Sequence, residues 1–347
     1  MERFFCFEPC LSVVQQTRYN KRKKNQKRGE GMLSIVVPCF NEAETIPHFV
    51  AAVDAVMTPI AQEIEYIFVD DGSKDQTLTI LQELNKQRPQ EIHYLSFSRN
   101  FGKEAALYAG LKNAKGSVIT VMDADLQDPP ELLPQMLDML QNEHLDCVGT
   151  RRKNRTGEPP IRSFFSKAFY KIINQFSDNE MIDGVRDFRL MTRQMVDAIL
   201  EMTEYNRFSK GIFSWVGFKT EYIAYENRER VAGETSWSFW GLFKYSLDGI
   251  VNFSEAPLMF ASFVGALSCL GAGIALIFIV TRALLFGDPT SGWPSIVSIM
   301  LFMGGLQLLC LGIIGKYIGK IFLETKKRPI YLIREQSEVI AEASKDE

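Results

Sequence analysis

Two short acidic motifs are the groups in this 347-residue chain best suited to chemistry. Asp70 and Asp71 are adjacent, while Asp123 and Asp125 are separated by one residue and followed by Gln127. Carboxylates held so close together repel one another unless a proton or a cation lies between them. Mg²⁺ or Mn²⁺ is the simplest partner, because these hard cations take oxygen ligands and commonly join protein carboxylates to a diphosphate. The pattern therefore predicts a metal site at Asp123, Asp125 and Gln127, with solvated loop acids as the alternative.

The segments that must position these acids alternate between strand and helix. Short β-branched or apolar runs predict buried strands at 33–38, 64–69, 92–97, 117–122 and 145–149. Helical spacing, with Pro130 in the first turn of the last segment, predicts helices at 42–57, 74–87, 102–115 and 130–141. Alternation of this kind indicates an α/β fold with a mainly parallel sheet and helices on both of its faces.

Sheets of this kind bind their ligands beyond the carboxyl ends of the parallel strands. In this chain the rule selects four polar segments, at 38–42, 70–73, 98–103 and 123–127. Both acidic motifs fall within these segments, so the composition and the topology indicate the same cleft. We therefore expect the metal and the substrate at this edge of the sheet.

Two long apolar segments near the C-terminus indicate a membrane anchor. Residues 257–280 contain no charge, and residues 293–315 contain only Gln307 as a strongly polar member. Each would extend about 35 Å as a helix, enough to cross a hydrocarbon core of about 30 Å. Lysines and arginines follow the second segment, so the positive-inside rule places both ends of the hairpin, and the globular domain, in the cytoplasm. The alternative is a pair of helices buried in a soluble protein.

Amphipathic segments and the chain ends complete the predicted organisation. Segments 161–176 and 236–253 carry aromatic residues at helical spacing, which suits a membrane surface or, alternatively, the protein's own core. We expect a disordered basic extension at 1–31, a globular domain at 32–235, an interfacial helix at 236–256, the hairpin at 257–315 and a basic tail at 316–347. The extension is alternatively a lipid tether or a mis-assigned start, with translation beginning at Met32.

Three motifs carry a resemblance to a known family: Ile35-Val36-Val37-Pro38 with Asn41-Glu42, Val69-Asp70-Asp71-Gly72-Ser73, and Met122-Asp123-Ala124-Asp125-Leu126-Gln127-Asp128-Pro129-Pro130-Glu131. The chain resembles the family 2 glycosyltransferases, which have a GT-A fold. More narrowly, it is similar to the polyprenyl-phosphate glycosyltransferases, such as dolichol-phosphate mannosyltransferase and the bacterial bactoprenol glucosyltransferases. The resemblance extends from residue 33 to residue 328 and includes the two-helix anchor, so chance is a poor explanation for it.

The resemblance implies a donor site and a metal site at matching positions. The nucleotide-sugar would contact Pro38, Asn41, Glu42, Asp71, Arg99, Lys103 and Asp123, with a solvated loop as the alternative for Arg99 and Lys103. Within that set, Asp71 would hold the uracil edge. The cation and the diphosphate would lie at Asp123, Asp125 and Gln127, so that Asp125 also serves catalysis.

The resemblance also implies the residues that act on the acceptor and on the leaving group. Asp187 matches the acid usually proposed as catalytic base, and Arg228 and Arg230 match a mobile basic loop that closes over the diphosphate. Ser236 stands where many relatives have a lysine in that loop. The lipid phosphate would be bound by Arg151, Arg162 and Ser166. Because a phosphate acceptor is already anionic near neutral pH, we expect Asp187 to orient groups more than to accept a proton.

The implied activity is transfer of a sugar, with inversion at its anomeric carbon, from a UDP-sugar to undecaprenyl phosphate at the cytoplasmic face of the cell membrane. Glucose and N-acetylglucosamine are the leading sugars, ahead of UDP-galactose or a GDP-sugar. The alternatives are a processive polysaccharide synthase, although no Gln-x-x-Arg-Trp motif is present, and a non-catalytic scaffold, although the acids are intact. The resemblance further implies a homo-oligomer (a tetramer), a downstream flippase, and use of the product in a cell-wall or surface glycan. The nearly balanced charge, 39 Lys and Arg against 42 Asp and Glu, gives no indication of a nucleic-acid partner.

Overall fold

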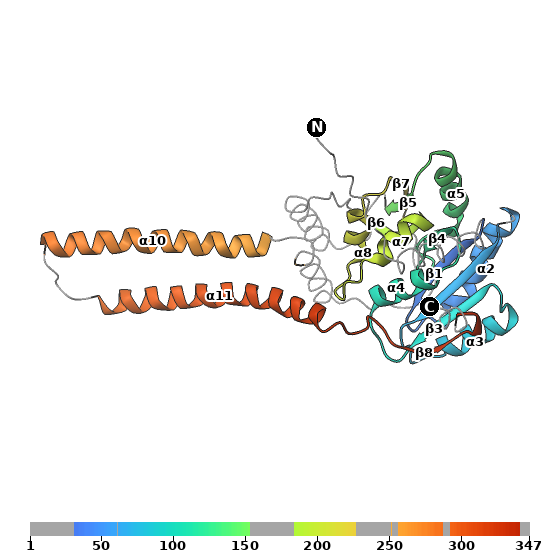
Figure 1. The fold of residues 1–347 in the computed structure, drawn as a ribbon, viewed down its shortest axis with the longest axis horizontal. Coiled ribbons are helices and arrows are strands. Elements are labelled where there is room, and N and C mark those ends of the chain that lie inside the picture. The colour runs from blue at the N-terminus through green and yellow to red at the C-terminus, as the bar shows by residue number, and fades with distance from the viewer. Residues whose placement is uncertain are drawn as a thin grey trace, which may run out of the picture.

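The computed structural model describes residues 31–60, 62–152, 184–226, 251, 256–286 and 292–340. Figure 1 shows a sheet domain from which a pair of long helices extends. The predicted amphipathic segments at 161–176 and 236–253 lie outside the described residues, as does the extension up to residue 30.

The described part of the chain forms one eight-stranded sheet in the order β7-β5-β6-β4-β1-β2-β3-β8. Its strands are β1 (Leu33–Cys39), β2 (Ile64–Asp70), β3 (Ile92–Phe97), β4 (Val118–Val121), β5 (Cys147–Arg152), β6 (Val185–Thr192), β7 (Thr220–Tyr225) and β8 (Ile333–Gln336). The four central strands, β3, β2, β1 and β4, run parallel, as do β5 and β7. By contrast, β6 is antiparallel to both of its neighbours, and β8 is antiparallel to β3. The sheet is therefore mixed, with the predicted parallel arrangement at its centre.

Helices cover both faces of this sheet, as the alternating pattern predicted. They are α2 (Thr45–Met57), α3 (Thr77–Gln87), α4 (Lys103–Asn113), α5 (Leu133–Asn142), α7 (Arg193–Glu201) and α8 (Ser209–Trp215). Successive β1 side chains point to opposite faces, so Ile35 packs in the core with Phe49 of α2, whereas Val36 packs in the core with Ala106 of α4. Gly110 lets α4 approach closely, because a Cβ there would lie 2.2 Å from Val36 Cγ1.

The chain beyond residue 149 contains structure that the sequence pattern did not indicate. β5 continues to Arg152, and the segment that follows the gap at 153–183 adds β6, α7, α8 and β7. β6 carries Arg186, Asp187 and Arg189 among its apolar residues, so it has neither the continuous apolar run nor the strict alternation that predicts a strand. Its pairing partners, rather than its own sequence, determine its conformation.

The two helices that extend from the sheet domain are α10 (Ala256–Phe286) and α11 (Trp293–Thr325). Each contains a window long and apolar enough to cross a membrane, at Pro257–Ala275 and Phe302–Thr325. The helices lie side by side, and Cys310 Sγ is 3.7 Å from the Ala261 carbonyl oxygen. Their large apolar side chains are exposed, with Leu308 70% accessible. Burial in the chain's own core, the alternative to a membrane anchor, is therefore wrong for these helices.

The C-terminal segment returns from α11 to the sheet. The carboxylate of Glu324 accepts hydrogen bonds from the backbone N–H groups of Tyr205 (3.0 Å) and Asn206 (3.2 Å). Farther along, Ser98 N–H donates to the Leu332 carbonyl oxygen at 2.9 Å, beside the pairing of β8 with β3. The end of α11 is thus joined to the sheet next to one of the polar segments predicted to line the site.

Candidate active site

The polar segments at the carboxyl ends of the parallel strands meet at one edge of the sheet. Asn41, with φ of 57°, donates its backbone N–H to Ser73 Oγ at 2.9 Å and accepts the Lys74 N–H on its side chain at 2.9 Å. Next to it, Glu42 N–H donates to Thr77 Oγ1 at 2.9 Å. These bonds join the loop after β1 to the loop after β2, so two of the four polar segments predicted to line the cleft lie together.

Asp71 fixes the loop that follows β3. Its carboxylate is buried and accepts the backbone N–H groups of Phe101 (2.6 Å) and Gly102 (2.9 Å). Burial raises the pKa of Asp71 to about 6, and the two N–H donors partly oppose that rise. Gly72 is required here, because its φ is +70° and a Cβ would lie 2.6 Å from the Arg99 carbonyl carbon. Asp71 therefore orders the 98–103 loop, and its contact with a uracil edge stays a prediction.

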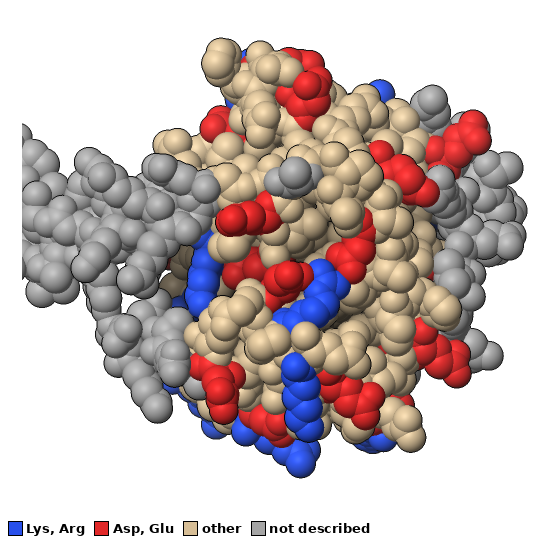
Figure 2. All heavy atoms as spheres, turned by 90° about the vertical axis from the view of Figure 1, so that its right-hand side faces the viewer, with Lys and Arg blue, Asp and Glu red and all other residues tan. Residues whose placement is uncertain are grey.

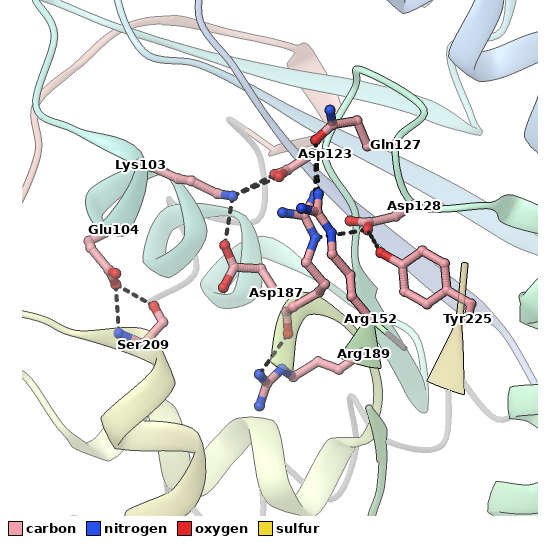
Figure 3. Close-up of polar contacts among 11 residues, drawn as sticks. Lys103, Glu104, Asp123, Gln127, Asp128, Arg152, Asp187, Arg189, Ser209 and Tyr225 are labelled. Atoms are coloured by element: carbon pink, nitrogen blue, oxygen red, sulfur yellow. Dashed lines mark hydrogen bonds and ion pairs between the residues drawn. The ribbon is translucent and has the colours of Figure 1, made fainter. Parts of the chain in front are cut away.

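A lysine bridges two of the predicted site carboxylates. Lys103 Nζ lies 2.6 Å and 2.9 Å from the two oxygens of Asp123 and 2.7 Å from Asp187 Oδ2 (Figure 3). The register of β4 against β6, in which Val121 pairs with Arg189, places Asp123 opposite Asp187. We call Asp123, Asp125, Asp187 and Lys103 the acidic cluster.

The charges of the acidic cluster stabilise one another. Burial would lower the pKa of Lys103, but Asp123 and Asp187 outweigh it and hold that pKa above its ordinary value. Burial would likewise raise the pKa of Asp187, but Lys103 and Lys210 hold it well below its ordinary value. Asp187 is therefore an ionised carboxylate at neutral pH and a poor proton acceptor.

The acidic cluster suits a divalent cation. Asp125 is 7% accessible, and its Oδ1 accepts the Gln127 N–H at 3.1 Å. A cation, the Lys103 ammonium, already lies between Asp123 and Asp187, which demonstrates that positive charge is accommodated there. Within the described ranges, no three His, Cys, Asp or Glu side chains are grouped closely enough to hold a metal by themselves. Mg²⁺ commonly takes one or two protein carboxylates together with substrate phosphates.

Arginines occupy the other side of the site. Arg152, at the end of β5, and Arg186, in β6, each donate from Nη2 to Gln127 Oε1 at 3.3 Å. Arg186 Nε also donates to Asp128 Oδ1 at 3.1 Å, and the Tyr225 hydroxyl donates to the same oxygen at 2.5 Å. We call these five residues the arginine cluster (Figure 3). Gln127 would have to turn its carbonyl oxygen away from both guanidinium groups in order to bind a metal.

The arginine cluster has more positive than negative charge. It holds two guanidinium groups and one carboxylate, that of Asp128, which is 1% accessible. Burial would lower the pKa of Arg186, but Asp128 and Asp123 raise it above its ordinary value. Planar guanidinium groups match the oxygens of a phosphate, so this side of the site suits an anion. Figure 2 shows acidic and basic side chains close together around a hollow in one face of the sheet domain.

A layer of buried contacts supports Asp187 and its neighbours. Arg189 packs its guanidinium 3.7 Å from the Phe213 ring and donates to the Arg186 carbonyl oxygen at 3.1 Å. The Glu104 carboxylate accepts the backbone N–H of Ser209 at 2.9 Å and also the Ser209 hydroxyl. These contacts fix α8 against the start of α4 and against β6, the elements that carry Lys103 and Asp187.

The structure brings together most of the predicted site residues that it describes. Lys103, Asp123 and Asp187 are in direct contact, and Asp125 follows Asp123 in the same turn. Pro38 is half-buried at the end of β1, whereas Arg99 and Arg151 are exposed. The remaining predicted residues lie outside the described part of the chain: Arg162, Ser166, Arg228 and Arg230.

Four site residues had not been singled out from the sequence: Arg152, Arg186, Asp128 and Tyr225. Three of them stand beside residues that were, since Arg152 follows Arg151, Arg186 precedes Asp187, and Asp128 follows Gln127. Adjacency to a motif was therefore an available signal. Tyr225 had no such signal, because only the pairing of β7 with β5 brings it to this edge.

Comparisons with known proteins identify relatives along most of the chain. The Glycosyl transferase family 2 model matches residues 34–200. The chain is 42% identical to the putative glycosyltransferase CsbB of Bacillus subtilis strain 168, covering 88% of this chain and 92% of that protein. It is 40% identical to the prophage bactoprenol glucosyl transferase homolog of Escherichia coli strain K12, over 87% and 98% of the two chains. It is 39% identical to the bactoprenol glucosyl transferase of Shigella phage SfV, over 88% and 99%.

Proposed function

Because the chain belongs to glycosyl transferase family 2, we propose that it transfers glucose from UDP-glucose to a polyprenyl phosphate, undecaprenyl phosphate in a bacterium. Two relatives similar over nearly their whole length are named as bactoprenol glucosyl transferases or homologues of them, which favours this acceptor and this sugar. UDP-N-acetylglucosamine is the second donor to test. The observation that carries the proposal is the acidic cluster lying next to the arginine cluster at one sheet edge.

The donor's diphosphate belongs, in this proposal, at the acidic cluster. Asp123 and Asp125 hold the divalent cation, Mg²⁺ or Mn²⁺. When bound, that cation offsets the negative charge that develops on the leaving diphosphate. Pro38, at the end of β1, and the following loop with Asn41 and Glu42 line the nucleotide pocket, next to the loop after β2. Arg228 and Arg230 close over the diphosphate.

The acceptor phosphate belongs at the arginine cluster. Arg152 and Arg186 present guanidinium groups that suit phosphate oxygens, and Arg151 lies at the same strand end. We assign Arg162 and Ser166 to the same phosphate. The acceptor is already anionic, since the second pKa of a phosphate monoester is about 6. The acceptor phosphate therefore needs orientation more than deprotonation, and Asp187 supports that orientation by holding Lys103. Attack from the side opposite the diphosphate inverts the configuration at the anomeric carbon.

The α10–α11 hairpin serves as a two-span membrane anchor in this proposal. Its apolar side chains are exposed along the length of both helices, as a lipid environment requires. The basic end of α11, with Lys316, Lys320 and Lys326, lies beside the sheet domain, so the positive-inside rule places that domain in the cytoplasm. The polyprenyl chain then remains in the bilayer while its phosphate reaches the site. We further propose that the protein forms a homo-oligomer and that a flippase moves its product across the membrane.

The test is a donor panel with the purified full chain in detergent. Undecaprenyl phosphate, Mg²⁺ or Mn²⁺ and a series of radiolabelled nucleotide-sugars are supplied one donor at a time. We expect label in the lipid with UDP-glucose, one sugar per lipid, and no label after chelation of the metal. A polymeric product would indicate a processive synthase, and no transfer from any donor would contradict the proposal.

A further inference from the structure

Lys103 occupies the position at which a divalent cation would meet Asp123. Its ammonium group contacts both Asp123 oxygens, at 2.6 Å and 2.9 Å, and one Asp187 oxygen at 2.7 Å. Neither oxygen of the Asp123 carboxylate is thus without contact to the ammonium group. A metal ion that binds Asp123 therefore needs an oxygen that the ammonium already contacts.

The backbone at Lys103 is held rigidly. Lys103 is the first residue of α4, directly after the loop that Asp71 fixes through the Phe101 and Gly102 N–H groups. At the other end of α4, Gly110 packs closely against Val36 of β1. The Lys103 side chain, by contrast, is free to change conformation, because it is 34% accessible and has a flexible four-carbon stem. The ammonium group can thus be withdrawn without any movement of the helix.

A divalent ion and an ammonium ion cannot share Asp123 without strong mutual repulsion. Like charges a few ångströms apart repel by about 4 kcal/mol per pair of unit charges at the edge of a protein. Asp187, on the neighbouring strand, gives the ammonium a second carboxylate that it already contacts. Retreat from Asp123 therefore leaves Lys103 paired.

We propose that Lys103 is a placeholder cation, which balances Asp123 and Asp187 in the donor-free site and gives up Asp123 when a divalent cation enters. This inference rests on the proposed metal role of Asp123. Its consequence is an order of binding. A bare cation competes with Lys103 and binds weakly, whereas a cation entering with a nucleotide diphosphate binds tightly, because the displaced ammonium then faces the negative charge of the diphosphate.

The test measures Mn²⁺ affinity by electron paramagnetic resonance in the absence of nucleotide. If the ammonium occupies Asp123 in nine of ten molecules, its removal strengthens Mn²⁺ binding about tenfold. We expect that gain in Lys103→Met. Lys210→Met is the matched control, since Lys210 is the other lysine acting on Asp187, yet no contact between it and Asp123 is observed among the described residues. A gain of equal size in both variants would reduce the effect to a general loss of positive charge and overturn the proposal.

A second arm adds UDP. In the wild type UDP should strengthen Mn²⁺ binding at least about tenfold more than it does in Lys103→Met, because only the wild type has an ammonium to displace. Lys103→Gln, which keeps a polar group near Asp123, is the substitute if the methionine variant does not fold. Unchanged or weaker Mn²⁺ binding in the folded variant contradicts the inference. The proposed transfer activity is judged separately by the donor panel, which can fail or succeed independently of these affinities.

Discussion

The acidic cluster and the arginine cluster lie beside each other at the same sheet edge but have opposite charge. The first has three carboxylates, those of Asp123, Asp125 and Asp187, against one ammonium ion, whereas the second has two guanidinium groups against one carboxylate. A site with one sign of charge would attract either the metal or the phosphates. Two adjoining clusters of opposite sign suit a cation–diphosphate group and a phosphate at once, and substitutions in each cluster should separate these two roles.

Removal of a metal-binding carboxylate should have the largest effect. We expect Asp125→Ala to reduce transfer by at least about a thousandfold, because several kcal/mol of leaving-group stabilisation are lost. The measurement is radiolabel incorporated into lipid at saturating Mn²⁺. Asp138→Ala, at an exposed position of α5, is the control and should retain full activity. Full activity in Asp125→Ala would remove Asp125 from the metal site.

Removal of a guanidinium group from the arginine cluster should come next. Arg186→Met should lower kcat/KM for the lipid phosphate by about a hundredfold, since one charged donor to phosphate oxygens disappears. Steady-state kinetics with varied acceptor measures this, with Arg334→Met on the exposed face of β8 as the control. If only the KM of the nucleotide-sugar rises, the arginine cluster serves the donor and the proposed division is wrong.

The acidic cluster should not act through proton transfer at Asp187. Lys103 and Lys210 hold the pKa of Asp187 below the ordinary value, against the effect of burial. The Asp187 carboxylate therefore stays ionised at every pH above about 4, and the stability that its charge contributes is lost only under more acidic conditions. We expect Asp187→Asn to lower turnover roughly tenfold, by loosening Lys103, with the same factor at each pH from 5 to 9. If the acid limb of the pH–rate profile disappears in the variant, Asp187 is the base after all.

The smallest effect should come from loss of the Tyr225–Asp128 hydrogen bond in the arginine cluster. Tyr225→Phe removes one hydrogen bond to Asp128 but leaves Arg186 in place. Loss of a hydrogen bond to a charged group costs about 1.5 kcal/mol, which lowers Tm by roughly 3–6 °C in a domain of this size. Turnover should stay within about threefold of the wild type. Tyr222→Phe on the same strand is the control for thermal unfolding. An equal decrease of Tm in both variants would contradict a specific role for Tyr225.

The central sheet and half of the site could be predicted from the sequence, because local pattern determines them. The strands from β1 to β4 are short apolar runs, and the acids follow them directly, so topology places Asp71 and Asp123 at one edge. The arginine cluster depends instead on antiparallel pairing of β6 with β4 and β5, a long-range contact that the mixed polarity of β6 conceals. The pairing of Lys103 with Asp123 and Asp187 likewise could not be predicted from the sequence. The three side chains come from different elements: the start of α4, the turn after β4, and β6. β8 is four residues long, too short for its own pattern to predict it.

The position of β8 in the chain has a consequence for biogenesis. β8 follows both apolar helices, yet it completes the sheet edge beside β3, with Tyr331 stacked 5.0 Å from the Phe97 ring. On the ribosome, β3 is therefore synthesised long before its outer neighbour exists, and its edge stays open until the hairpin has left the exit tunnel. The sheet of a globular unit built in this way is completed only after both long helices have been made, which ties maturation of the sheet domain to synthesis of α10 and α11.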